Sequence, residues 1–446
     1  MTFYTDTLRP QILVDSKVAT SVFIRLVVIA GLVFAFFIDA ISGPQALAWG
    51  VFFGSVRIFR PISLLNVIIA YWFISFVLTA PVLVPMYTDK LCLHFAGIQS
   101  CITAGYWLRR LVKAKTPKPI LPPASPTVRA RFHTAWFVVA GIGFASILTQ
   151  IALAGPTEWF TGAVLAAQME NYANGSAAET VSRLLTWVVN WTLLVLFVFH
   201  RVHRVPMGYF SFLAAWIGLP MIALARALLF YNALFVLFTH KIRLWMVFLG
   251  IGVVAAALFI GFLRASHLQT LDPYDAVGFV FSGEFSSAVA YSDVVVSESH
   301  IEKQWGVPIV VPVVLAVVPR FAYPDKPLNG AGIYMQQFQP GLLERGYSAA
   351  INPLTDSYIS FGFWGMIAFA IAFGWLYSSV DRNIELRRIS VLDYLLMFNC
   401  YLIMRNALAV PLTQILIQLI LYLVISRVLT YSGRPQRNIA ARNHRP

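Results

Sequence analysis

Charged residues are scarce in this chain, and their scarcity defines its class. Asp, Glu, Lys and Arg together make up 12% of the 446 residues, whereas hydrophobic residues make up 59%. Soluble domains usually carry about 25% charged residues. The composition therefore predicts one membrane domain over 1–446, and we expect an all-α, polytopic integral membrane protein.

Several motifs of soluble chemistry are also missing. The chain has no P-loop, no GxGxxG and no Asp-x-Asp pair, which argues against an ATP-driven pump and against an enzyme that uses nucleotide sugars. The three cysteines, Cys92, Cys101 and Cys400, form no CxxC pair and predict neither a disulfide framework nor a metal site. We therefore expect no cofactor and no metal.

Long hydrophobic runs are the main feature that is present. A membrane-spanning helix needs about 20 apolar residues. The runs predict about twelve spans, near 21–40, 42–59, 62–86, 91–108, 134–154, 183–200, 206–224, 227–239, 244–263, 357–379, 389–408 and 411–428. The run 306–319 is short and contains three prolines, which favours a re-entrant or interfacial segment.

The positions of Lys and Arg predict the orientation of these spans. Basic residues collect in short cytoplasmic loops, and the most basic segments are 109–133, 200–204, 240–243, 381–388 and the tail. We therefore expect both termini to be cytoplasmic, with 109–133 as a cytoplasmic linker and 155–182 and 264–356 as outer loops. This asymmetry explains most of the net charge of +14, so no nucleic-acid partner is expected.

Nine cations are not explained by topology: Lys90, Arg183, Arg226, Arg264, Lys303, Arg320, Lys326, Arg345 and Arg405. Arg226 and Arg405 lie between apolar residues, and Arg264 closes a predicted span. Charges inside membrane segments are costly and usually mark a cavity or a pathway. A snorkelling or ion-paired residue near a span end is the alternative for each.

The stretch "VPRFAYPDKPLNGAG" (318–332) holds Arg320 and Lys326 among three prolines. Proline fixes its own φ and keeps the preceding residue extended, which lowers the entropic cost of presenting both cations. Arg can bind two phosphate oxygens at once, and Lys acts as a point charge. Outer cations that converge in a membrane protein predict an anionic ligand, for which a lipid pyrophosphate is the natural candidate. A surface loop with a local Asp325–Lys326 pair is the alternative.

Carboxylates and aromatic residues in the outer region supply the other candidates. Glu284 or Asp356 could deprotonate an attacking hydroxyl, although spacing does not choose between them and the other outer acidic residues and histidines. Tyr323 and Tyr358 belong to a set of aromatic residues that could stack on sugars. Interfacial aromatic belts are the common alternative.

Together these features resemble the bacterial oligosaccharide repeat-unit polymerases, which are the O-antigen and exopolysaccharide polymerases. The resemblance is carried by Arg226 after a mid-chain apolar segment, by "GEF" at 283–285, by Pro319–Arg320, Tyr323–Pro324 and Lys326–Pro327, and by "GFWG" at 362–365. The match covers roughly 220–380, and the N-terminal half is similar in hydropathy only.

The resemblance implies a GT-C-like glycosyltransferase in the bacterial inner membrane, with its active site facing the periplasm. Such an enzyme moves a growing glycan from undecaprenyl pyrophosphate to the non-reducing end of a new lipid-linked repeat unit, without a metal. The residues themselves fit that chemistry. Glu284 or Asp356 would be the base or would orient the acceptor, and Arg320 is the third candidate catalytic residue. The cations expected to bind the pyrophosphate are Arg226, Arg264, Arg320, Lys326, Arg345 and Arg405. Tyr323 and Tyr358 would contact sugars, and membrane lipid, a flippase and a chain-length regulator are the expected partners.

Two other functions fit the same sequence. An O-antigen ligase would transfer finished glycan to lipid A core. A flippase or transporter of lipid-linked sugars also fits twelve spans, although an outer region of about 90 residues suits poorly a transporter built from two similar halves. A scaffold without chemistry would leave Arg226 unexplained. The sugars, their linkage and the oligomeric state stay open.

Overall fold

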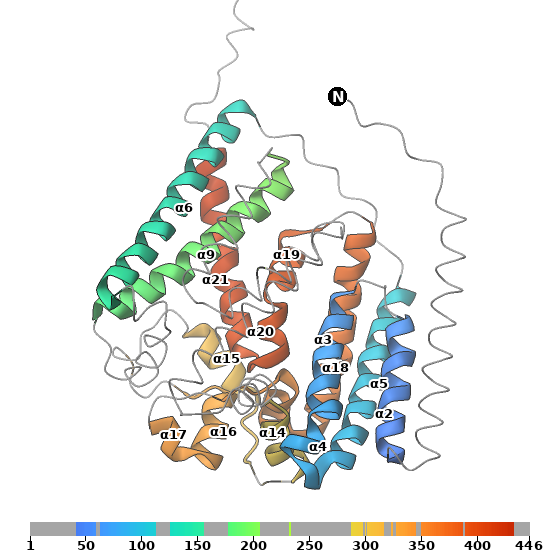
Figure 1. Ribbon diagram of the computed structural model, residues 1–446. Helices are drawn as coiled ribbons and strands as arrows, with labels where there is room; N and C mark the ends of the chain where they lie inside the picture. The colour runs from blue at the N-terminus through green and yellow to red at the C-terminus, as the bar shows by residue number, and fades with distance from the viewer. Residues whose placement is uncertain are drawn as a thin grey trace, which may run out of the picture.

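The computed structural model describes residues 42–58, 63–112, 125–155, 177–205, 232, 287–297, 299, 301–315, 323, 327–344, 349–386 and 389–431. Every regular element in these ranges is helical (Figure 1), so the all-α class is confirmed for the described part. Four helices are long and apolar enough to cross a membrane: α6 (Pro126–Ala154), α9 (Ala177–His203), α18 (Pro353–Glu385) and α21 (Ala409–Thr430). The protein is therefore a helical membrane protein.

The remaining predicted spans have three outcomes. Helices α2 (Gly43–Ile58) and α5 (Thr88–Leu111) lie where spans were expected at 42–59 and 91–108. The predicted spans at 62–86 and 389–408 each contain shorter helical pieces rather than one helix. The spans expected near 21–40, 206–224, 227–239 and 244–263 lie outside the described residues.

The interrupted spans contain π-helical and 3₁₀ turns. Residues 62–86 hold α3 (Leu64–Phe73), the π-helix η1 (Ile74–Leu78), α4 (Ala80–Leu83) and the 3₁₀ turn η2 (Pro85–Tyr87). Residues 389–408 hold α19 (Val391–Phe398) and α20 (Cys400–Arg405). A proline cannot donate an N–H to the helix ladder, which suits the short pieces at Pro81 and Pro85.

The predicted outer loop 264–356 contributes short helices to the described part before α18 begins at Pro353. They are α14 (Ser287–Tyr291), the π-helix η3 (Ser292–Val296), α15 (Val307–Val314), α16 (Gly330–Phe338) and α17 (Pro340–Glu344). At a rise of 1.5 Å per residue, α15 is about 12 Å long. It is far shorter than a membrane span, as expected for the run 306–319.

The closest helix pair of the bundle is α5 and α18, which run side by side with α3 (Figure 1). A Cβ atom added to Gly105 of α5 would lie 2.0 Å from the carbonyl oxygen of Ile371. A Cβ atom added to Gly374 of α18 would lie 2.0 Å from the carbonyl oxygen of Ile102. The two backbones therefore touch through glycine, which is the way small residues let membrane helices approach closely.

The basic helix ends lie at one end of the bundle. Arg131 at the start of α6 donates a hydrogen bond to the carbonyl of Tyr431 just after α21. Arg110 at the end of α5 pairs with Glu385 at the end of α18. We call this the basic end; the ends of α5, α6, α9, α18 and α21 that form it lie in the upper part of Figure 1, and their sequences carry Arg109, Arg110, Arg129, Arg131, Arg201, Arg204, Arg382 and Arg427.

Candidate functional site

Interrupted helices meet at the end of the bundle opposite the basic end. The interruptions are the two π-helices η1 and η3, a break in α18 at Gly362, and the turn between α20 and α21. Irregular backbone at membrane depth is tolerated where protein buries it or where it lines a cavity. Because π-helical turns and discontinuous helices are frequent at functional sites, we take this broken-helix junction as the candidate site.

Asp356, in the first turn of α18, is the central carboxylate of the junction. Its side chain has 0% exposure. The Oδ2 atom accepts the backbone N–H of Leu408 at 2.7 Å. The Oδ1 atom has no hydrogen-bond partner among the described residues, and a Cβ atom on Gly330 would lie only 2.0 Å from it. Asp356 therefore connects α18 to the start of α16 and to the turn before α21.

Asn352 fixes the start of α18 and so places Asp356. Its side-chain oxygen accepts the N–H of Thr355 at 2.9 Å, and Pro353 occupies the first turn, where its missing N–H costs nothing. The side-chain amide of Asn352 donates to the carbonyl oxygen of Ser287 at 3.5 Å. The same cap thus ties α18 to α14.

Two tyrosines connect the junction to α5 and α16. The hydroxyl of Tyr291, a fully buried residue, lies 3.1 Å from Nδ1 of His94 on α5. The hydroxyl of Tyr334 on α16 donates to the Asp293 carboxylate in η3 at 2.7 Å. Burial raises the pKa of Tyr334, and the hydrogen bond to Asp293 raises it further. The Tyr334 hydroxyl is therefore a stable neutral donor.

The break in α18 is covered by the segment before α15. Gly362 has φ 72° and ψ −166°, a conformation open to glycine but strained for other residues. The N–H of Gln304 donates to the carbonyl of Ile359 at 3.3 Å, which satisfies a group next to the break. A Cβ atom on Gly362 would lie 2.8 Å from Cε of Lys303, so the lysine side chain lies over the glycine.

Arg405 is the last residue of α20 and directly precedes the turn that Asp356 contacts. Its Nη1 atom donates to the hydroxyl of Tyr401 at 3.1 Å. The carbonyl of the preceding residue, Met404, accepts the indole N–H of Trp72 from α3 at 2.9 Å. The backbone on the N-terminal side of Arg405 is therefore fixed by a side chain with 1% exposure.

The sequence-predicted site residues thus have different outcomes. The structure brings Asp356 and Arg405 to one junction, and Tyr358 lies half-buried two residues after Asp356 on α18. Tyr323 is 40% exposed. The remaining candidates lie outside the described residues: Glu284, Arg226, Arg264, Arg320, Lys326 and Arg345. In the described part no group of three or more His, Cys, Asp and Glu could hold a metal ion.

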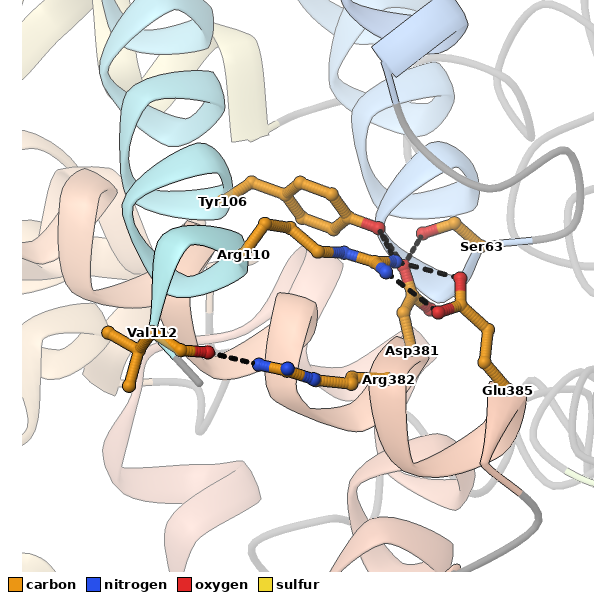
Figure 2. Close-up of polar contacts among 7 residues, drawn as sticks. All are labelled: Ser63, Tyr106, Arg110, Val112, Asp381, Arg382 and Glu385. Atoms are coloured by element: carbon orange, nitrogen blue, oxygen red, sulfur yellow. Dashed lines mark hydrogen bonds and ion pairs between the residues drawn. The ribbon is translucent and has the colours of Figure 1, made fainter. Parts of the chain in front are cut away.

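A second polar cluster, which no sequence pattern predicts, lies at the basic end (Figure 2). Asp381 is fully buried, and its Oδ2 atom accepts the hydroxyls of Ser63 at 2.6 Å and Tyr106 at 3.0 Å. Arg110 donates to both carboxylate oxygens of Glu385, at 2.7 and 2.8 Å, and to the Tyr106 hydroxyl at 2.9 Å. Three helices, α3, α5 and α18, are therefore held together at this end.

Residues that sequence reasoning missed are those that act through backbone groups. Gly330 and the N–H of Leu408 contact Asp356 from 26 and 52 residues away. The Asn-Gly and Asn-Pro pairs at 329–330 and 352–353 are helix-start signals that could have placed α16 and the start of α18. No pattern in the sequence pointed to the Leu408 amide.

Comparison with known proteins adds no family to these observations. No protein-family model, no curated protein and no solved structure matches the chain.

Proposed function

We propose that this protein is a membrane-embedded glycosyltransferase that polymerises lipid-linked oligosaccharide repeat units at the periplasmic face of the bacterial inner membrane. It would transfer the growing glycan from undecaprenyl pyrophosphate to the non-reducing end of a new lipid-linked unit. The observation that carries the proposal is the contact between Gly330 and Asp356. It fixes the last residues of the proline-rich stretch 318–332 at the junction that also holds Arg405.

Chain connectivity strengthens this argument. Lys326 precedes Gly330 by four residues in the sequence, and four residues of extended chain reach about 14 Å at most. The stretch that carries Arg320 and Lys326 is therefore tethered to the junction at its C-terminal end. Arg405 reaches the same junction from the other direction, through the turn to α21.

Transfer of a glycan from pyrophosphate requires cations that stabilise the leaving group. The acceptor hydroxyl attacks the anomeric carbon, the bond from that carbon to the pyrophosphate oxygen breaks, and negative charge grows on the leaving group. Preorganised cations in a site of low dielectric stabilise that charge most effectively. We assign this role to Arg226, Arg264, Arg320, Lys326, Arg345 and Arg405.

A carboxylate must also take the proton of the attacking hydroxyl. Of the two carboxylates expected for this role, Glu284 keeps it, because Asp356 has 0% exposure and its Oδ2 atom already accepts the Leu408 N–H. Tyr323 and Tyr358 are assigned to sugar contacts. The expected partners are a flippase that supplies the lipid-linked unit and a chain-length regulator.

The test is polymerisation by the purified protein. Lipid-linked repeat units extracted from a strain that lacks this gene are incubated with the protein in nanodiscs, and the products are separated by length. We expect a ladder of products, which Arg226→Ala and Arg320→Ala abolish although both variants insert normally. Arg110→Ala, at the basic end, is the control and keeps the ladder. Full-length products from both test variants, or no ladder from the wild type, would overturn the proposal.

The broken helices favour a second candidate, a transporter of lipid-linked sugars, because transporters often bind substrate at discontinuous helices. The two functions differ in their product. A transporter moves the lipid-linked unit across a liposome membrane without lengthening the glycan. The polymerase lengthens the glycan without moving the lipid.

A further inference from the structure

The Asp356 side chain contacts two other segments of the junction, the α20–α21 turn through Oδ2 and the start of α16 through Oδ1. We propose that Asp356 is a positioning residue that holds the α20–α21 turn and thereby presents Arg405 to the leaving pyrophosphate. This inference rests on the proposed function for its consequence in catalysis. The contact by which Asp356 holds the α20–α21 turn depends only on the geometry of the junction.

The backbone around Arg405 is held on both sides. On the N-terminal side, the Met404 carbonyl accepts the buried indole N–H of Trp72 at 2.9 Å. On the C-terminal side, the Leu408 N–H donates to Oδ2 of Asp356 at 2.7 Å. Two buried side chains, one from α3 and one from α18, therefore determine where α20 ends.

The start of α21 has no local side chain that caps it, and Asp356 accepts one of its N–H groups instead. Leu408 is the N-cap residue of α21, and its own side chain makes no capping hydrogen bond. The first N–H groups of a helix have no partner within the helix and carry partial positive charge. A carboxyl group brought from another helix thus accepts the N–H of the N-cap residue, as the N3 side chain of a capping box does locally, which gives this buried polar group a structural role.

The contact with Gly330 makes the position of the Asp356 carboxyl group depend on the position of the start of α16. Because a Cβ atom at residue 330 would lie 2.0 Å from Oδ1, a side chain at the start of α16 would displace the Asp356 carboxyl group from its present position. The position of the proline-rich stretch and that of Arg405 are consequently coupled through one side chain. A rigid supporting shell of this kind holds functional groups in productive geometry.

The first experiment separates positioning from proton transfer. Asp356→Asn keeps an oxygen that can accept the Leu408 N–H but cannot take a proton, whereas Asp356→Ala removes both properties. We expect the polymerisation rate of Asp356→Asn to stay within about threefold of the wild-type rate. The rates of Asp356→Ala and Arg405→Ala should both fall by about a hundredfold, by analogy with the removal of one preorganised donor. Equal losses in Asp356→Asn and Asp356→Ala would show a base and overturn the inference.

A double variant tests whether Asp356 acts through Arg405. Groups that act as one unit give non-additive effects. The double variant Asp356→Ala/Arg405→Ala should therefore be no slower than Arg405→Ala alone. Losses that multiply would assign Asp356 a separate role and contradict the inference.

A measurement independent of activity completes the test. In the protein in nanodiscs, hydrogen exchange of the Leu408 amide should be about tenfold faster in Asp356→Ala than in wild type, since the amide loses its buried hydrogen-bond acceptor. It should stay slow in Asp356→Asn. Gly330→Ala should accelerate it as well, because the new methyl displaces the carboxylate. The matched control is Asp381→Ala, which removes another fully buried carboxylate of α18 and should leave Leu408 exchange unchanged.

These readouts keep the two proposals apart. If the wild type makes no ladder, the proposed function fails, and Leu408 exchange still shows whether Asp356 holds the turn. If the Leu408 amide exchanges at the same rate in Asp356→Ala and wild type, or if its exchange rises equally in Asp381→Ala, Asp356 does not hold the α20–α21 turn. That conclusion is independent of the polymerisation result.

Discussion

The glycine contact between α5 and α18 makes a prediction whose size follows from the structure. In Gly374→Ala the new methyl would lie 2.0 Å from the carbonyl oxygen of Ile102 and 3.0 Å from the backbone nitrogen of Tyr106. Carbon–oxygen contacts across packed helices are normally about 3.3 Å or longer. The two helices must therefore separate by about 1.3 Å at the crossing, because backbone atoms cannot rotate out of the way as a side chain does.

The expected cost is a loss of stability of about 1–3 kcal/mol, the range for overpacking a well-packed interior. Thermal unfolding in detergent, followed by intrinsic tryptophan fluorescence, measures it. Gly105→Ala should give a similar loss, since its methyl would meet the Ile371 carbonyl oxygen at 2.0 Å. The double variant should lose less than the sum, because one separation of the helices relieves both clashes.

The matched control is Gly97→Ala on α5, the helix that also carries Gly105, where a Cβ atom meets nothing within 4 Å. This variant should be neutral or slightly stabilised, since alanine favours the helix over glycine by about 1 kcal/mol. If Gly374→Ala and Gly97→Ala unfold at the same temperature, the backbones of α5 and α18 are not in contact and the argument is wrong.

Three further predictions concern the two ends of the bundle. In a denaturant unfolding assay, Asp381→Ala should destabilise the protein by about 2–4 kcal/mol, because two buried hydroxyls lose their acceptor. Glu385→Gln should cost about 1 kcal/mol or less, because the Arg110–Glu385 pair has side-chain exposures of 30% and 35%. Equal losses in the two variants would contradict the buried network. Leu111 and Met86 are 73% and 88% exposed. In a cysteine-free background, Leu111→Cys and Met86→Cys should react with a membrane-impermeant maleimide from opposite sides of the membrane. Labelling of both positions from one side would refute the predicted topology. Asn329→Ala removes the cap on the Gly332 N–H and should lower stability by about 1 kcal/mol in the unfolding assay, while no change would show that the cap is dispensable.

The sequence predicts the long helices well because hydropathy alone decides them. The α6, α9, α18 and α21 segments are long apolar runs, and nothing in their composition competes with a helix across the membrane. The interruptions were harder to predict. The π-helix Ile74–Leu78 contains neither proline nor glycine, so its apolar residues read as part of one continuous span. Its geometry is set by tertiary packing that a single sequence does not display.

The candidate site was only partly predictable, and for a related reason. Asp356 could be singled out from the sequence because a carboxylate at the start of an apolar span is unusual. Its partners could not, because one is a backbone N–H 52 residues away and the other is a glycine with no side chain. Asp381 could not be singled out, because it opens the basic segment 381–388 and nothing in that segment indicates that α18 continues to Glu385 and buries the Asp381 carboxyl group.

The two buried carboxylates divide α18 into parts with different constraints. Beyond Gly362 the helix is locked to α5 through Gly374 and to α3 and α5 through Asp381, so this part is a fixed frame. At Gly362 the helix is interrupted, and the short helical piece before it, which carries Asp356, is held by α14, α16 and the α20–α21 turn. The two buried carboxylates of α18 therefore lie in parts of the helix that are held by different neighbours: Asp356 by the junction, and Asp381 by α3 and α5.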